Sequence, residues 1–288
     1  MVNNMYFDTF FIIGSGKIAF DCSNILLGLG VSHFIIDSRP KLVSTIEFQH
    51  KQEGVTLLEW DKRKSIESQI INNALGMTLV ISANNEHVFE KDVFLDNIKI
   101  INFHYGLLPD YRGMNIPSWI IYNEEVFSGV TWHYVNEKID DGRIIAQRKF
   151  DIDKWDTAFL ITKRVMIYGG ELFKEFIEDF LNGPQIGYIN DFNKCEHRYC
   201  RNDVPNNGVI SEKDSGSVIS KCLRAYDYGL YEYIPKLKFK KRENLYTVLK
   251  YRIYKCNELK IGKNNWQANY TITCDEYKFD LLLSEKVV

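Results

Sequence analysis

The chain has 288 residues, of which 45% are apolar and 26% charged, and its formal net charge is −2. These values are typical of globular proteins, so they exclude disorder, collagen and a continuous coiled coil for the whole chain, and they indicate no general attraction to nucleic acid. Apolar runs extend only about four residues where a membrane-spanning helix needs roughly 20, and no signal-peptide pattern is present, so we expect a cytoplasmic protein that does not enter the membrane.

Strand and helix patterns alternate over the first two-thirds of the chain. Short apolar or β-branched runs predict strands at residues 10–13, 33–37, 77–81, 98–103, 129–135 and 144–150. The spacing of apolar residues predicts helices at residues 18–26, 66–75, 115–122 and 156–181. The last of these ends at Asn182-Gly183-Pro184, a helix-terminating sequence. This alternation indicates an α/β fold with a largely parallel sheet and flanking helices.

The character of the sequence changes after Pro184. A polar stretch is followed by a predicted helix at residues 215–224 and by strand-like segments at 247–254 and 268–283. We therefore expect two domains, residues 1–188 and a smaller C-terminal module with β content at residues 189–288.

The six cysteines do not indicate a disulfide framework, because the chain is neither small nor recognisably secreted. Cys195, His197 and Cys200 have the spacing of zinc ligands, but a structural zinc needs a fourth ligand and no second cluster is evident. We therefore predict free thiols and no metal, with a zinc site at these residues as the alternative.

One candidate site is a glycine-rich turn. Gly14-Ser15-Gly16 and Ala19 fit the pattern G-x-G-x-x-A between a predicted strand and a predicted helix, and Asp37 ends the next strand. Such glycines let the backbone approach a pyrophosphate, and the acid binds a ribose hydroxyl. The pattern indicates a dinucleotide site, or else a tight turn that binds nothing.

A second pattern favours acyl-transfer chemistry. Strand alternation places the side chains of Asn102 and His104 on one face at the end of a predicted strand. An amide donor and an imidazole there can stabilise an oxyanion and move protons. A third group follows later in the chain, in Ile139-Asp140-Asp141-Gly142, and it can hold and charge-stabilise the histidine as a triad carboxylate does. The alternative is a strand-end histidine without a catalytic role.

Asn102, His104 and Asp140 belong to a longer ordered pattern. It consists of Asn-x-His at 102–104, Leu-Leu-Pro at 107–109, Tyr-Arg-Gly at 111–113, Pro117, Gly-Val-Thr at 129–131 and Asp-x-Gly at 140–142. This pattern resembles the formyltransferases that use 10-formyltetrahydrofolate. The match is clear over residues 98–145 and plausible over residues 8–185. Tyr105-Gly106 departs from it, because many members have a small residue and a serine there.

The resemblance implies a Rossmann-like sheet without NAD, and it implies roles for the residues of the pattern. Asn102, His104 and Asp140 would be catalytic: Asn102 and protonated His104 would stabilise the oxyanion, and Asp140 would keep His104 charged and oriented. 10-Formyltetrahydrofolate would be the co-substrate. The residues expected to contact it are Ile81, Asn84, Leu107, Leu108, Pro109, Ile139 and Gly142.

The length and near-neutral charge of the chain favour the sugar-nucleotide N-formyltransferases among these enzymes, because a tRNA-binding member needs a basic surface. The expected substrate is dTDP-4-amino-4,6-dideoxyglucose, used for bacterial O-antigen lipopolysaccharide, with dTDP-3-amino-3,6-dideoxyhexose or a UDP-linked 4-amino sugar as alternatives. The residues expected to contact the substrate are Gly14, Ser15, Lys17, Tyr111, Arg112, Trp132, Tyr134, Tyr226 and Lys236.

Other interpretations stay open from the sequence. An NAD-dependent oxidoreductase would use the glycine turn and Asp37, and a silent binder of folate or sugar nucleotide would keep the same residues without turnover. In the C-terminal module, the lysines near Lys236 favour a diphosphate contact or a solvated edge strand. Its closing strands are candidates for a homodimer interface.

Overall fold

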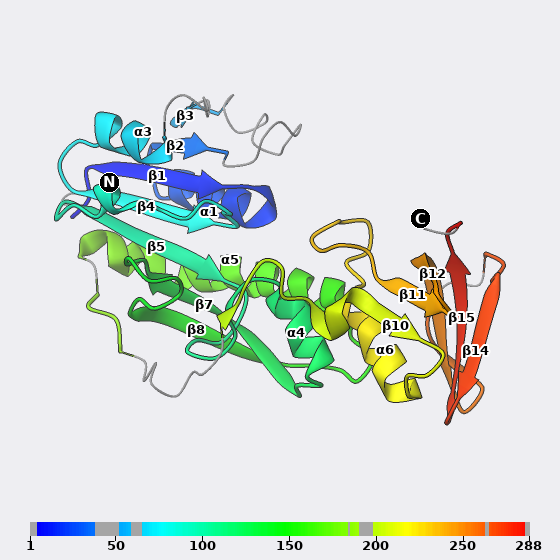
Figure 1. The fold of residues 1–288 in the computed structure, drawn as a ribbon. Helices are drawn as coiled ribbons and strands as arrows, with labels where there is room; N and C mark the ends of the chain where they lie inside the picture. The colour runs from blue at the N-terminus through cyan, green and yellow to red at the C-terminus, as the bar shows by residue number, and fades with distance from the viewer. Residues whose placement is uncertain are drawn as a thin grey trace. The chain divides into compact units, whose positions relative to one another are not determined.

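A seven-stranded sheet and a six-stranded sheet organise the chain in the computed structural model (Figure 1). The structure describes residues 5–37, 52–58, 65–183, 185–189, 198–262 and 265–285. The chain divides into two structural units. The first unit comprises residues 1–112, 129–149 and 164–198, and the second comprises residues 113–128, 150–163 and 199–288.

The seven-stranded sheet has the order β3-β2-β1-β4-β5-β7-β8. Its strands are β1 (Thr9–Gly14), β2 (His33–Ile36), β3 (Val55–Leu57), β4 (Thr78–Ala83), β5 (Ile98–His104), β7 (Phe127–Tyr134) and β8 (Ile144–Asp151). The pairs among β1 to β5 are parallel, and β7 is antiparallel to β5. The predicted α/β class with a mostly parallel sheet is confirmed.

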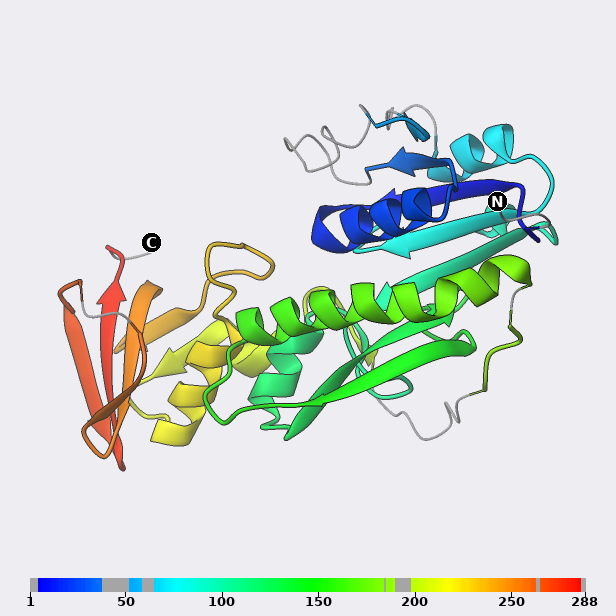
Figure 2. The ribbon, with the colours of Figure 1, turned by 180° about the vertical axis from the view of Figure 1, so that it is seen from behind.

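Helices cover both faces of this sheet. On one face lie α1 (Gly16–Gly28) and the part of α5 (Ala158–Asn182) that belongs to the first unit, as the view from behind shows (Figure 2). Gly169 of α5 allows close contact with the Phe103 ring, since a Cβ there would lie 2.1 Å from a ring atom. On the other face, α3 (Ile66–Asn73) packs Ile66 and Ile70 against the sheet, next to the short helix η1 (Lys91–Val93). The central strands β1 and β4 are therefore buried on both faces, as the strands of parallel sheets usually are.

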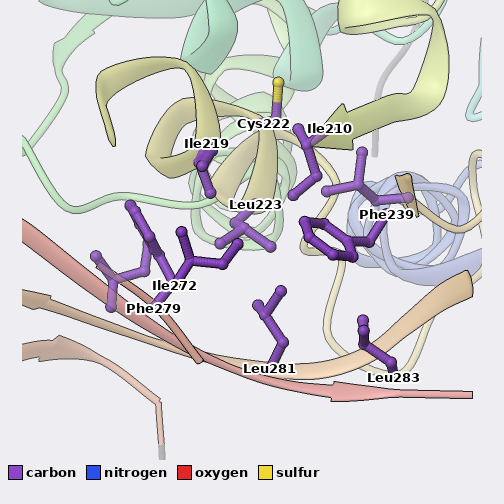
Figure 3. Packing of buried hydrophobic residues seen from close by; sticks show 11 residues of the cluster. Ile210, Ile219, Cys222, Leu223, Phe239, Ile272, Phe279, Leu281 and Leu283 are labelled. Carbon is purple, nitrogen blue, oxygen red and sulfur yellow. The ribbon is translucent and has the colours of Figure 1, made fainter. Parts of the chain in front are cut away.

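The second unit is built on a helix packed against a sheet. Its core joins α6 (Gly216–Ala225) to one face of the six-stranded sheet, where Leu223, Phe239 and Phe279 are buried (Figure 3). The strands of this sheet are β10 (Val209–Ser211), β11 (Lys238–Lys241), β12 (Asn244–Lys255), β13 (Glu258–Ile261), β14 (Tyr270–Cys274) and β15 (Tyr277–Leu283). The remaining elements are α4 (Ile116–Tyr122), η3 (Pro205–Gly208) and the paired short strands β6 (Arg112–Gly113) and β9 (Arg198–Tyr199).

The structure adds detail to two sequence expectations, the strand at 268–283 and the division of the chain into two domains. The single strand-like segment expected at 268–283 is a hairpin, because Asp275 adopts a left-handed φ of 56° between β14 and β15. The structural units do not follow one cut in the sequence, since residues 113–128 and 150–163 belong to the second unit. The functional division at residues 188 and 189 stays a prediction.

The described part of the chain contains no helix that is both long and apolar enough to cross a bilayer. Within the same residues, no three His, Cys, Asp or Glu side chains gather as a set of metal ligands. The alternative zinc site falls largely outside the description, because Cys195 and His197 are not among the described residues.

Replacing Phe279 by alanine tests the core of the second unit. The ring is fully buried between α6 and the sheet, and truncating a buried phenylalanine costs about 3–5 kcal/mol. We expect faster amide hydrogen exchange throughout β12, β14 and β15, measured by mass spectrometry of peptides from these strands. The exposed Thr273 on β14 provides the control variant Thr273→Ala. Equal protection in Phe279→Ala and wild type would contradict this assignment of the core.

Candidate active site

The candidate site lies on β5 and β7 of the first sheet, beside the strands β1 and β4 between which the strand order reverses. Open α/β sheets bind ligands beside such a point, at the carboxyl ends of their strands. Here hydrogen bonds join the residues that follow three strands. The amide Nδ2 of Asn84 lies 3.3 Å from both the carbonyl and the hydroxyl oxygen of Ser15, and the Tyr105 hydroxyl donates to Asn84 Oδ1 at 2.8 Å. Asn84 therefore lies at this edge, and Tyr105, the departure from the family pattern, anchors it.

The register of β5 and β7 decides which side chains meet. Asn102 is directly opposite His133, and Phe103 is opposite Trp132. Opposed residues share a face of the sheet, so Asn102 and His133 point one way and the two aromatic rings the other. The amide Nδ2 of Asn102 lies 3.1 Å from His133 Nε2. His104 lies two residues further along β5, on the same face as Asn102.

Asp140 joins this group from the loop between β7 and β8. One carboxylate oxygen lies 3.6 Å from His104 Nδ1, and the other lies 3.6 Å from His133 Nε2. Both distances suit ion pairing but exceed a direct hydrogen bond. The side chains of His104 and His133 are 5% and 2% exposed, and that of Asp140 is 10% exposed. The structure thus brings the three predicted catalytic residues together and adds His133.

The loop that carries Asp140 has a specific backbone shape. Asp140 adopts a left-handed φ of 53°, which is uncommon for a residue other than glycine. The Arg112 guanidinium donates to the carbonyl of Ile139 at 2.6 Å and lies 3.2 Å from the Asp141 carboxylate. Gly142 packs so closely that a Cβ would lie 1.7 Å from the Tyr134 carbonyl oxygen. Arg112 thus holds this loop in place, and its expected contact with substrate stays a prediction.

His104 has a defined tautomer when neutral. Its Nε2 lies 2.8 Å from the carbonyl oxygen of Tyr111, which can only accept, so the proton is on Nε2 and Nδ1 faces Asp140. Burial lowers the pKa of His104 below its usual value, although the Asp140 carboxylate acts in the opposite direction. Loss of hydration therefore outweighs the ion pair in the pKa of His104, and the role of Asp140 in keeping His104 charged stays a prediction.

The residues expected to contact the folate have different environments. The loop after β5 is held by Thr131, whose hydroxyl donates to Gly106 O at 2.6 Å and accepts from Leu108 N at 3.2 Å. Leu107 and Pro109 are half-buried there, whereas Leu108 is buried. Ile139 is 40% exposed beside Asp140, and Gly142 is buried. Ile81 is fully buried within β4, so its side chain belongs to the core, which corrects the expectation that it contacts a ligand.

The glycine turn is explained by packing within the protein. A Cβ on Gly14 would lie 2.0 Å from the carbonyl oxygen of Ala83 on the adjacent strand β4. Ser15 is fully buried, and its hydroxyl donates to the Asn84 carbonyl. The buried Ser15 side chain therefore gives no contact surface, contrary to expectation, and a substrate contact by the Gly14 backbone stays a prediction. Lys17 is exposed and pairs with Asp21 one helical turn later.

Trp132 and Tyr134 of β7 were both expected to contact substrate, and for Tyr134 this stays a prediction. Trp132 is fully buried, and its indole N–H donates to Gly169 O at 2.9 Å on the α5 face of the sheet. The prediction that Trp132 contacts substrate is therefore wrong. The Tyr134 hydroxyl donates to the Gln185 carbonyl, and burial raises its pKa to about 12. It ties the segment after α5 to the sheet edge.

The two remaining predicted contacts lie in the second unit. The Tyr226 hydroxyl donates to the Pro205 carbonyl oxygen at 2.8 Å, and Lys236 is exposed and pairs with Glu232 at 2.9 Å. Both side chains already have partners within their own unit, and their contact with a substrate stays a prediction.

His133 was not predicted from the sequence as a member of the catalytic group. Its signal lay in the strand pattern, because pairing of 98–104 with 127–134 in antiparallel register places one residue of the second strand opposite Asn102. Sequence alone does not give that register. A shift by one residue would have placed a tryptophan or a tyrosine there instead.

Comparison with known proteins identifies the family of the region that carries these residues. Residues 44–177 match the formyl transferase family. The GDP-perosamine N-formyltransferase of Brucella melitensis is 31% identical over 126 residues, which are 43% of this chain and 47% of that enzyme. An N-formyltransferase from Helicobacter canadensis, solved in complex with folinic acid and dTDP-3-aminofucose, superposes with a TM-score of 0.71 at 22% identity, covering 96% of this chain and 99% of that one. A 4-N formyltransferase from Francisella tularensis gives a TM-score of 0.65 at 22% identity, covering 81% and 93%.

Residues 44–177 are therefore a formyl transferase domain, which confirms the resemblance drawn from the sequence pattern. Asn102, His104 and Asp140 all lie inside the matched range, whereas the Gly14–Gly16 turn lies outside it. The chain spans about half the length of the curated Brucella relative that it matches. The solved structures share the overall fold of this chain at a low level of identity.

Replacing Asp140 by asparagine tests the electrostatics of the site. The carboxylate raises the pKa of His104 against the effect of burial, so its loss must lower that pKa further. We expect the wild-type His104 resonance to titrate below the ordinary histidine value of about 6.5, and the Asp140→Asn resonance to titrate lower still, by nuclear magnetic resonance.

The buried His33, whose pKa is also lowered by burial, is the internal control, because its partners Ser23 and Val31 are unaffected. An unchanged or raised His104 pKa in Asp140→Asn would contradict the assigned pairing. The direction of the His104 pKa shift also determines how pH affects the free energy of unfolding. The unfolded chain takes up this proton at a higher pH than the folded one, so the His104 contribution to the free energy of unfolding falls as the pH drops below about 6.5.

Proposed function

We propose that this protein is an N-formyltransferase that transfers the formyl group of 10-formyltetrahydrofolate to the amino group of a nucleotide-linked amino-deoxy sugar. The observation that carries the proposal is the meeting of Asn102, His104 and Asp140 at the carboxyl edge of the sheet, inside a formyl transferase domain. An amide donor, an imidazole and a carboxylate are the groups that such an acyl transfer needs.

Asn102 supplies a hydrogen-bond donor to the negative charge that develops on the formyl oxygen. Its Nδ2 carries two hydrogens, and one of them is taken by His133. The second hydrogen can point toward the formyl oxygen of the bound co-substrate. A donor held before reaction needs no reorganisation when the charge appears, and it is therefore worth more than a donor in water.

His104 and Asp140 bind the attacking amine through hydrogen bonds. Neutral His104 has its lone pair on Nδ1, and the Asp140 carboxylate lies 3.6 Å away from that nitrogen. An attacking amine bound here would donate hydrogen bonds to both acceptors. The new C–N bond forms as the amine loses a proton to Nδ1, and the protonated imidazole is then stabilised by Asp140. The proton is returned to the nitrogen of the departing carrier as its bond to the formyl carbon breaks.

The residues around this group fit a folate. A pterin is a flat ring system that needs apolar surface beside polar groups. The half-buried Leu107, three residues after His104, and the exposed Ile139, next to Asp140 in the sequence, provide such surface. The bound carrier supplies the formyl group. The Thr131 bonds to the loop after β5 keep that apolar surface in place.

The choice of a sugar nucleotide as acceptor rests on the length and near-neutral charge of this chain and on the substrates named for similar proteins. The Brucella relative is a GDP-perosamine enzyme, and the structurally similar proteins include one bound to dTDP-3-aminofucose and one 4-N formyltransferase. We favour dTDP-4-amino-4,6-dideoxyglucose as the acceptor. The dTDP-linked 3-amino isomers, UDP-linked 4-amino sugars and GDP-perosamine are the competitors to be tested beside it.

The purified protein should form a formamide when mixed with 10-formyltetrahydrofolate and one of these amino sugars. Release of tetrahydrofolate followed by absorbance gives the rate, and the mass of the sugar product identifies the acceptor. A gain of one formyl group on a single sugar would establish both reaction and substrate. A folded protein that binds formylfolate and turns over none of the sugars would contradict the proposed acceptor class.

Replacing His104 by asparagine should lower kcat at least about 10²-fold, the usual cost of losing one preorganised group at such a site. His33→Asn is the matched control, because it also removes a buried imidazole from the first unit but leaves the candidate site intact. We expect His33→Asn to keep most of the wild-type kcat at a temperature where it is folded. Equal losses in both variants would show that the effect is one of stability and not of chemistry.

A further inference from the structure

Asn102 can act as a donor only if its side-chain amide points the right way. The two ends of a carboxamide are almost equal in size, but one donates hydrogen bonds and the other accepts them. If the amide were reversed, its oxygen would face the place where negative charge develops. The site therefore needs something that selects one of the two orientations, and this requirement lies beyond the three catalytic residues.

A chain of hydrogen bonds reaches the oxygen of Asn102 from the loop after β4. The backbone N–H of His87, which can only donate, lies 2.9 Å from Asn85 Oδ1. The other end of that amide, Asn85 Nδ2, donates to Ser82 Oγ at 3.3 Å. Because the Ser82 oxygen accepts this bond, its own hydrogen is available for Asn102 Oδ1, which lies 2.7 Å away.

A second chain reaches the nitrogen of Asn102 from the opposite side. The backbone carbonyl of Tyr134, which can only accept, lies 2.7 Å from His133 Nδ1. The neutral imidazole of His133 therefore carries its proton on Nδ1 and a lone pair on Nε2. That lone pair accepts from Asn102 Nδ2 at 3.1 Å. The two chains begin at different backbone groups and require the same orientation of Asn102.

Both partners of Asn102 are buried, so water does not compete with them. Ser82 and His133 are each 2% exposed. A reversed Asn102 would place its oxygen against the lone pair of His133 and near the Asp140 carboxylate, which lies 3.6 Å from the same nitrogen. Two buried hydrogen-bond acceptors that face each other without a hydrogen between them raise the free energy. The reversed orientation of the Asn102 amide is therefore disfavoured.

We infer that Ser82 is a positioning residue for formyl transfer, and that together with His133 it fixes the Asn102 amide with its N–H toward the reaction. The inference rests on the proposed function for its kinetic consequence, but the hydrogen-bond arrangement itself can be tested without turnover. Ser82 touches no reacting atom in this scheme. It acts through Asn102 alone, which distinguishes it from a residue that merely supports the fold of β4.

Replacing Ser82 by alanine, in the wild-type protein and in the Asn102→Ala variant, tests the kinetic consequence of the inference. In the wild-type background Ser82→Ala should lower kcat about tenfold, the effect of one ordinary hydrogen bond lost from the transition state, with KM for the sugar nucleotide nearly unchanged. In the Asn102→Ala background, Ser82→Ala should cause no further loss, because the group on which it acts is gone. Equal losses in the two backgrounds would overturn the inference.

Ser23→Ala provides the matched control. It also removes a buried serine hydroxyl from a 2.7 Å hydrogen bond, here to His33, on a helix of the same unit. We expect it to cost stability without lowering kcat at a temperature where the protein stays folded. A kcat loss in Ser23→Ala equal to that in Ser82→Ala would show that the effect is not specific to Asn102.

Nuclear magnetic resonance of the wild-type protein tests the arrangement independently of activity. The imidazole nitrogen shifts of the neutral form of His133 should show a protonated Nδ1 and an unprotonated Nε2. A proton on Nε2 instead would require Asn102 to be reversed, and would overturn the inference whether or not the protein transfers formyl groups. If the His133 tautomer is as inferred but no amine accepts a formyl group, the proposed function fails and the inferred orientation stands.

Discussion

The site depends on one arrangement, a carboxylate held within 3.6 Å of two buried imidazole nitrogens. Burying ionisable groups is unfavourable unless partners offset the lost hydration. Here the partners come from the backbone: the Tyr111 and Tyr134 carbonyls each bind one histidine, and Arg112 holds the loop of Asp140. Burial outweighs the carboxylate and lowers the pKa of His104, which favours the neutral imidazole in the free site.

The α/β scaffold explains why these groups meet. Parallel strands end at the same edge, and the reversal of strand order next to β1 leaves that edge open to loops. The antiparallel strand β7 then places His133 opposite Asn102, which a sheet of parallel strands alone would not do. The loop from β7 to β8 brings Asp140 to both histidines. Its left-handed backbone at Asp140 and the close packing of Gly142 give the loop one shape.

Much of this was predictable from the sequence, and the failures have physical causes. Alternation along one strand places Asn102 and His104 on one face without any further information. Trp132 was assigned to the wrong face because its direction depends on a register between strands, which turns and tertiary packing set. The glycine turn fits a phosphate-binding pattern, yet Gly14 is needed for the close approach of Ala83 and Ser15 is buried against Asn84. The discontinuous second unit was missed because strand-helix alternation records the order of elements and not which of them pack together.

The most direct test of the account follows the formyl carbon itself. The protein is mixed with 10-formyltetrahydrofolate labelled with ¹³C in the formyl group and with the proposed amino sugar nucleotides, and the products are observed by ¹³C nuclear magnetic resonance. The account predicts a labelled formamide on the sugar with the wild-type protein, and none within the same time with Asn102→Ala or with His104→Asn. Label that appears only as formate, or a formamide made equally fast by these variants, would contradict the claim that this cluster performs the transfer.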